Sequence, residues 1–148
     1  MLTLCHDPLA RRGIRLEGDE LIVGGPGTSL QAGVLRWLKA EAREQLSRET
    51  ARIAAMAGVS VRAVSIGDPV SRWGSCSSSG TIRFSWRLIL APPQLLRFVV
   101  AHEVAHRLHM NHGPDFKAAE QRLFGGDVAV ARSELRRLGP SLRAVGRN

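Results

Sequence analysis

The sequence contains no tyrosine and only two cysteines, Cys5 and Cys76. Two thiols are too few for a disulfide framework, which favours a cytoplasmic location. No apolar run approaches the roughly 18–20 residues that a membrane span needs, and the N-terminus lacks the basic and then apolar segments of a signal peptide. With 44% apolar and 23% charged residues, the composition is typical of a globular protein rather than a disordered one.

Acidic residues are scarce relative to basic ones. Thirteen Asp and Glu stand against 21 Lys and Arg, which gives a formal net charge of +8. An excess of this size can attract nucleic acid or nucleotide phosphates. The arginines are spread from Arg11 to Arg147, however, with no dense basic run and no interleaved aromatic residues to stack bases. A basic background composition is therefore the favoured interpretation, and nucleic-acid or nucleotide association is the alternative.

The apolar patterns predict an α+β fold in a single domain over residues 1–148, with the motif-bearing core over residues 59–125. In the N-terminal half we expect a β-hairpin over 11–23 and a helix over 30–57, with Ser29 as N-cap and Gly58 at its end. A strand over 59–66 follows, and then two strands over 71–90 around a turn at 77–80. We expect the strands after residue 59 to form a small mixed or antiparallel sheet. In the last of them Ile82, Phe84 and Trp86 share one face.

Prolines and glycines divide the C-terminal half into helices. The expected helices run from Gln94 to about Met110 after two prolines, from residue 114 or 115 to 123, and from Asp127 as N-cap to about Leu138, where Gly139-Pro140 ends the last one and leaves a frayed tail. The first of these helices is apolar on nearly every side, so it is expected in the core.

That buried helix carries His-Glu-Val-Ala-His at residues 102–106. His102 and His106 are four residues apart, so their side chains stack on one helix face, while Glu103 projects about 100° away. In the HExxH motif two imidazoles bind Zn²⁺ and the glutamate acts on the metal-bound water. Burying these groups without a cation would cost several kcal/mol. The sequence therefore predicts one zinc ion per chain, with Glu103 as the general base.

A catalytic zinc ion needs a third protein ligand. His112 is the favoured candidate, because the chain must turn near it and can bring its imidazole back to the metal. His109 is a rival, but ligands at positions i, i+4 and i+7 of a straight helix converge poorly on one tetrahedral ion. Glu120, on the next helix, is a weaker contender.

Three sequence blocks carry a resemblance to a known family: RWGSC at 72–76, WRLILAPP at 86–93, and HEVAH followed by MNHGPDF between 102 and 116. With these blocks in order and correctly spaced, the chain resembles the YgjP-like metallopeptidases, relatives of the SprT and WLM zinc-dependent proteases. The resemblance implies a zincin-like fold, zinc on His102, His106 and His112, and Glu103 as general base. Lys117 departs from the tryptophan frequent at that place, and the chain before Val59 matches loosely.

The predicted activity is zinc-dependent hydrolysis of peptide bonds in a peptide or protein substrate, which could add as a strand near residues 72–76 or 81–86. One alternative is a metal-dependent hydrolase of a non-peptide substrate such as a nucleotide phosphoanhydride, although no Gly-rich phosphate loop is present. Another is a non-catalytic, zinc-stabilised module that binds nucleic acid. Glu103 argues against the latter, because a purely structural site does not use that carboxylate.

The lack of tyrosine also removes the phenol that several zinc peptidases use to stabilise the oxyanion. His109, Asn111 and Arg72 are the remaining candidates for that role. Trp73 is expected either in the core or along the substrate edge, and Cys76 is expected to be a small buried residue rather than a ligand or nucleophile.

Overall fold

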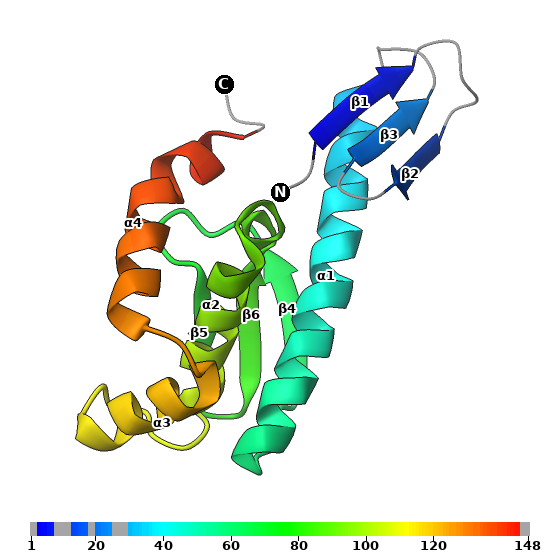
Figure 1. Ribbon diagram of the computed structural model, residues 1–148. Coiled ribbons are helices and arrows are strands. Elements are labelled where there is room, and N and C mark those ends of the chain that lie inside the picture. The colour runs from blue at the N-terminus through cyan, green and yellow to red at the C-terminus, as the bar shows by residue number, and fades with distance from the viewer. Residues whose placement is uncertain (1–2, 8–12, 18–19, 25–29, 146–148) are drawn as a thin grey trace.

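The computed structural model describes residues 3–7, 13–17, 20–24 and 30–145. Within them the chain forms a mixed α+β fold with two separate three-stranded sheets and four α-helices (Figure 1). This confirms the predicted fold class. The expectation of a single domain stays a prediction. None of the described helices is both long and apolar enough to cross a membrane.

The N-terminal sheet consists of β1 (Thr3–Asp7), β2 (Gly13–Glu17) and β3 (Glu20–Gly24) in the order β1-β3-β2. Strands β2 and β3 are antiparallel, with Leu16 opposite Leu21, which confirms the predicted hairpin. Strand β1 pairs with β3 in parallel, a pairing that the sequence pattern did not predict. The sheet lies beside the beginning of α1 (Leu30–Ala57), at the opposite end of the molecule from α3 (Pro114–Phe124) (Figure 1).

Helix α1 has the predicted bounds. Its apolar stripe is buried at Leu38, Ala42, Leu46 and Ile53, as expected for a helix that packs one face against the core. Gly58 ends the helix with a positive φ of 70°, a conformation that favours glycine. The predicted N-cap, Ser29, lies outside the described residues.

The second sheet consists of β4 (Ala63–Gly67), β5 (Gly74–Cys76) and β6 (Thr81–Ser85) in the order β4-β6-β5. Strand β6 is parallel to β4 and antiparallel to β5, so the predicted mixed sheet is confirmed. The strand predicted over 59–66 begins only at Ala63, because the amide of Val59 bonds back to the carbonyl of Ala54 at the end of α1.

The prediction that strand structure extends to Leu90 was wrong. The chain leaves the sheet at Ser85 and forms a 3-10 helix, η2 (Trp86–Leu90). The Ser85 hydroxyl accepts a hydrogen bond from the amide of Arg87 and so caps this helix. Ile82, Phe84 and Trp86 are nevertheless all buried, since η2 turns the indole into the core.

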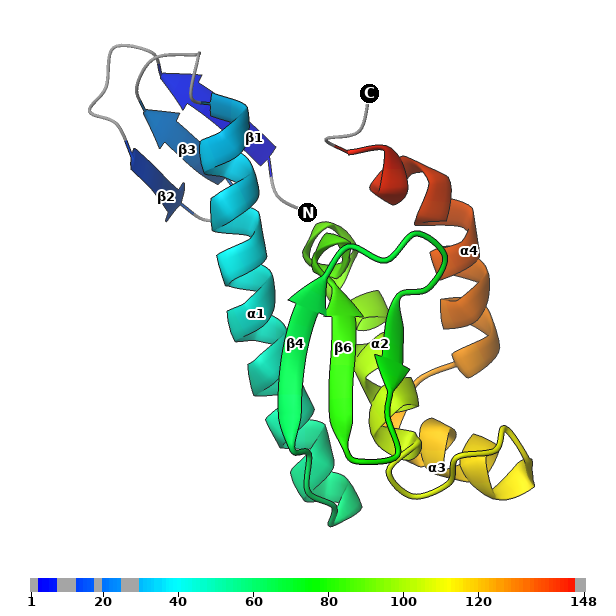
Figure 2. The same ribbon diagram turned by 180° about the vertical axis from the view of Figure 1, so that it is seen from behind.

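Helix α2 (Pro93–Ala105) covers one face of the β4-β6-β5 sheet (Figure 1), and the view from behind shows no described helix across the other face (Figure 2). The helix ends at Ala105, not near Met110 as predicted. Helix α3 agrees with its prediction to within a residue, and α4 (Val128–Ala144) begins after the predicted N-cap, whose carboxylate accepts from the amide of Val130.

The prediction that Gly139-Pro140 ends the last helix was also wrong, because α4 continues to Ala144. Leu142 in this last turn is buried. The buried Arg87 donates from Nη1 to the carbonyls of Leu142 and Val145 and pairs with Asp68. These contacts stabilise the final turn despite the hydrogen bond that Pro140 cannot donate.

Candidate metal centre

The site begins where α2 ends. His106 is the C-cap of α2, and its amide bonds to the carbonyls of Glu103 and Val104. The amides of Arg107 and Leu108 bond to carbonyls three residues earlier, so the last turn is tightened into 3-10 geometry. The amide of His109 still bonds to the carbonyl of Ala105, so the helical turn closes at His109. The chain then returns and brings His112 back to the end of α2.

Three imidazoles converge at this point. One ligand atom from each of His102, His106 and His112 lies within 4.8 Å of the others. Nε2 of His106 and Nε2 of His112 are 2.9 Å apart. The zinc–nitrogen bond of about 2.0–2.1 Å implies roughly 3.3 Å between ligand atoms of a tetrahedral site. The spacing of the three rings therefore fits a zinc ion, and three protein ligands leave one position open.

Two further contacts fix the tautomers of the rings. Nδ1 of His102 donates to Oε2 of Glu120 at 2.5 Å, and Nδ1 of His106 donates to the carbonyl of His109 at 3.2 Å. A neutral imidazole that donates from Nδ1 carries its lone pair on Nε2. Burial lowers the pKa of His106, against the effect of the His109 carbonyl, which favours that neutral form. Both rings are thus prepared to bind a metal through Nε2.

Glu120 is the residue whose role the sequence left open. It lies on α3, its side chain is only 1% exposed, and it also accepts from Nη2 of Arg132 at 3.3 Å. Burial would raise its pKa, but the hydrogen bond from His102 and the charge of Arg132 hold the pKa below its usual value. An ionised Glu120 therefore orients His102 from the side away from the cluster.

A single aromatic ring contacts all three imidazoles. The ring of Phe116, at the start of α3, has its centroid 5.0 Å from that of His102, 4.5 Å from that of His106 and 4.8 Å from that of His112. Phe116 is 2% exposed, so the three imidazoles pack against a buried ring. Phe116, Ala119, Glu120 and Leu123 share the buried face of α3 at helical spacing. An acidic residue on that apolar stripe is the sequence signal that could have identified Glu120 as the partner of His102.

Glu103 is buried against β5. A Cβ at Gly74 would lie 3.0 Å from both Cγ and Oε2 of Glu103, so a side chain at this position would require the carboxylate to shift slightly. Burial raises the pKa of Glu103 to about 7, and the electrostatic interactions with His102 and Arg72 oppose that rise. A carboxyl group with a pKa near neutrality can both accept and release a proton at physiological pH.

A hollow of about 220 Å³ opens beside His102 and Glu103, between α2, α4 and the start of β5. Its walls are mainly apolar, from Trp73, Phe98, Val99 and Leu135, with Arg132 adding a charge. This volume suits one side chain of a ligand that lies against the site.

The other sequence candidates lie around the cluster rather than in it. His109 and Asn111 are exposed, and His109 contributes its backbone carbonyl to His106 rather than its ring to the cluster. Cys76 is half-buried on β5, where burial and the charge of Glu103 raise the pKa of its thiol. Trp73 is partly buried, lines the hollow and lies under the guanidinium of Arg143 at 4.2 Å.

We predict that Glu120→Gln lowers zinc affinity by about 10- to 100-fold, because neutral glutamine holds the His102 ring less firmly than a carboxylate does. Competition with a chromophoric zinc chelator measures the change. Asp115→Asn, which neutralises an exposed carboxylate on the same helix, is the matched control. Equal affinity in the two variants would show that Glu120 does not support the site.

An α+β fold in which His102, His106 and His112 converge at the end of a buried helix is the arrangement expected of a zincin-like metallopeptidase. The sequence matches the YgjP-like metallopeptidase domain over residues 18–138, and the chain belongs to that family. No curated protein sequence matches the chain. The predicted kinship with SprT and WLM proteases stays a prediction.

Two crystal structures share this fold. The metallopeptidase zymogen of Pyrococcus abyssi abylysin is 18% identical, with a TM-score of 0.55, and the match covers 66% of this chain and 95% of that one. The metallopeptidase zymogen of Methanocaldococcus jannaschii jannalysin is 20% identical, with a TM-score of 0.52, over 64% of this chain and 95% of that one. The family points to peptide or protein substrates, and the predicted nucleic-acid association gains no support from it.

Proposed function

We propose that this protein hydrolyses peptide bonds with one zinc ion held by His102, His106 and His112. The convergence of these three imidazoles beside a buried Glu103 is the observation that carries the proposal. When bound, zinc lowers the pKa of water towards about 7 and polarises the scissile carbonyl. The HExxH mechanism and the identity of the metal are both part of this proposal.

Glu103 is the proposed proton carrier. Its raised pKa lets it take a proton from the attacking water and give that proton to the leaving amine within one turnover. Gly74 leaves the Glu103 carboxylate space at the edge of β5. A side chain at that position would press on Oε2 and displace it.

No described strand pairs with the outer edge of β5, and this edge is the proposed docking site for the substrate backbone. Strand β6 lies between β4 and β5, so of the two segments considered from the sequence only residues 72–76 can accept another strand. The Ser85 amide bonds to the carbonyl of Trp73, and the Ser77 amide to the carbonyl of Thr81. Backbone groups alternate along an antiparallel strand, so those of Gly74 and Cys76 face away from β6. They can pair with an extended peptide.

The hollow beside His102 and Glu103 is the proposed site for a side chain next to the scissile bond. Its mainly apolar walls favour an apolar side chain there. Together with the strand edge, it would orient a peptide across the three imidazoles.

The test combines metal content with turnover. Elemental mass spectrometry of the purified protein should find about one zinc ion per chain in the wild type and much less in His102→Ala. The zinc-loaded wild type should cleave unfolded casein, and a chelator should stop the cleavage until zinc is restored. A protein that binds no metal after zinc reconstitution would overturn the proposal.

A further inference from the structure

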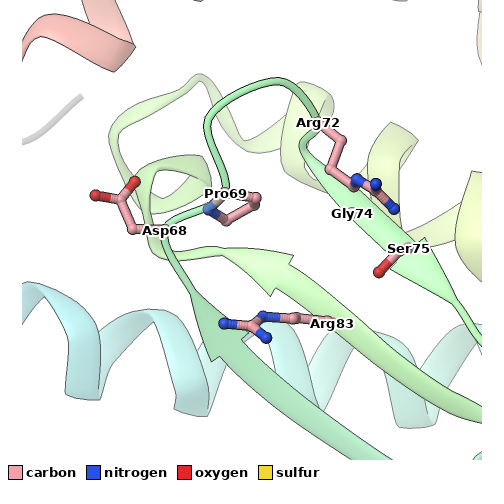
Figure 3. A pocket seen from close by; sticks show the side chains of 6 residues that line it. All are labelled: Asp68, Pro69, Arg72, Gly74, Ser75 and Arg83. Carbon is pink, nitrogen blue, oxygen red and sulfur yellow. The ribbon is translucent and has the colours of Figure 1, made fainter.

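A second pocket lies on the face of the β4-β6-β5 sheet away from α2. Its volume is about 390 Å³, and its lining comes from the loop after β4 and from the neighbouring strands: Asp68, Pro69, Arg72, Gly74, Ser75 and Arg83. Figure 3 shows Arg72 and Ser75 along β5, whereas the Arg83 side chain extends away from them across β4. The proposed hydrolysis does not use these three polar side chains.

The pocket carries positive charge from two exposed arginines, Arg72 and Arg83. Among the residues that the structure describes, no carboxylate lies within ion-pair distance of Arg72 or Arg83. The pocket's one carboxylate, Asp68, accepts hydrogen bonds from Nε and Nη2 of Arg87 at 2.8 and 3.2 Å. Its charge is therefore balanced by Arg87. Two guanidinium groups and a hydroxyl form a set of donors that suits an anion.

The guanidinium of Arg83 lies over Gly67 of the neighbouring strand β4. A Cβ on Gly67 of β4 would overlap Nη2, Nε and Cζ of Arg83. Glycine at this position therefore gives the guanidinium its place on the sheet surface. The Arg83 side chain is exposed on this face of the sheet, so a ligand can reach its charge.

The pocket and the metal centre lie on opposite faces of the same edge strand. Gly74 faces Glu103 on the inner side, whereas its neighbour Ser75 lines the outer pocket. Arg72, two residues before Gly74, also lines the outer pocket. Cross-strand neighbours point to the same face of a sheet. A peptide residue paired opposite Ser75 would therefore direct its side chain towards the outer pocket.

We propose that this pocket binds an acidic side chain of the peptide substrate, with Arg72 and Arg83 donating to its carboxylate. The inference rests on the proposed peptidase function and on docking along β5. A pocket of this kind would make the enzyme selective for a glutamate or aspartate near the scissile bond. The net charge of +8 would also attract acidic substrates to the protein.

The test uses the full-length, zinc-loaded protein and a mixed peptide library, with cleaved sites read by mass spectrometry. We expect the wild type to favour Glu or Asp at one fixed position, and a synthetic peptide with Glu there to exceed its Gln analogue in kcat/KM by about tenfold. Arg83→Gln should reduce this ratio to near one, and Arg83→Glu should shift the preference to Lys. Arg48→Gln, which removes an exposed arginine on α1, should leave the ratio as in the wild type.

Binding to the zinc-loaded Glu103→Gln protein separates this proposal from the peptidase function. Fluorescence anisotropy with fluorescently labelled forms of the Glu and Gln peptides measures how much more tightly the Glu peptide binds, without turnover. Cleavage with no acidic preference, or a preference that Arg83→Glu leaves unchanged, would overturn the pocket proposal and leave the peptidase. Acidic preference in binding without any cleavage would support the pocket and overturn the peptidase. Loss of binding to a single-stranded oligonucleotide in Arg83→Gln, with an unchanged peptide preference, would overturn the acidic side chain as the ligand.

Discussion

Glu103→Gln is expected to lower kcat/KM for peptide cleavage by about 10²- to 10⁴-fold, the usual contribution of a general acid–base group. Glutamine has nearly the same shape as glutamate, so it should still fit against Gly74. It cannot accept a proton, and both proposed proton transfers would lose their carrier. Because Glu103 does not belong to the group of residues that could hold the metal, the variant should still bind zinc.

Turnover of a quenched-fluorescence peptide and the zinc content of the same sample measure the two parts of this prediction. Glu44→Gln, an identical change on the exposed surface of α1, is the control and should keep wild-type turnover. A Glu103→Gln protein with full activity would remove Glu103 from the mechanism. A variant that loses zinc together with activity would instead place the carboxylate among the ligands.

His112→Ala is expected to lower zinc affinity by at least about a hundredfold, whereas His109→Ala should change it by less than about threefold. Structural zinc sites gain about 10–16 kcal/mol from four ligands, so one ligand contributes roughly 3 kcal/mol. His112 meets His106 at 2.9 Å through Nε2. His109 contributes only a backbone carbonyl to the site, and alanine keeps that carbonyl.

Both residues are exposed, so neither change should unfold the protein, and circular dichroism checks this point. Competition with a chromophoric chelator gives the two dissociation constants. Equal losses in the two variants would contradict the assignment of His112 as the third ligand. A larger loss in His109→Ala would mean that the loop after α2 rearranges when the metal binds.

The parts that depend on short-range patterns could be predicted from the sequence. The helical spacing of Leu38, Ala42 and Leu46 and the glycine at 58 were enough to place α1. The four-residue spacing of His102 and His106 places both rings on one helix face, whatever the helix packs against. These features depend on neighbours along the chain.

Features that depend on tertiary contacts could not be predicted in this way. Helix α2 ends at Ala105, and most amides of the turn that follows bond three residues back, although Leu108 continues the apolar pattern. The final turn of α4 persists past Pro140 because the distant Arg87 bonds to its carbonyls. Likewise the partnership of His102 and Glu120 joins residues from two helices, and no local pattern specifies which helices meet.

Phe116 has a thermodynamic consequence for the metal centre. Its ring lies against His102, His106 and His112 and restricts the rotation of each imidazole before any ion arrives. Ordering the three imidazoles costs side-chain entropy. Most of this cost therefore arises when α3 packs on α2, not when the metal binds. Metal affinity thus includes a share of the packing free energy of α3. Substitutions that loosen this helix far from any ligand should weaken binding in proportion.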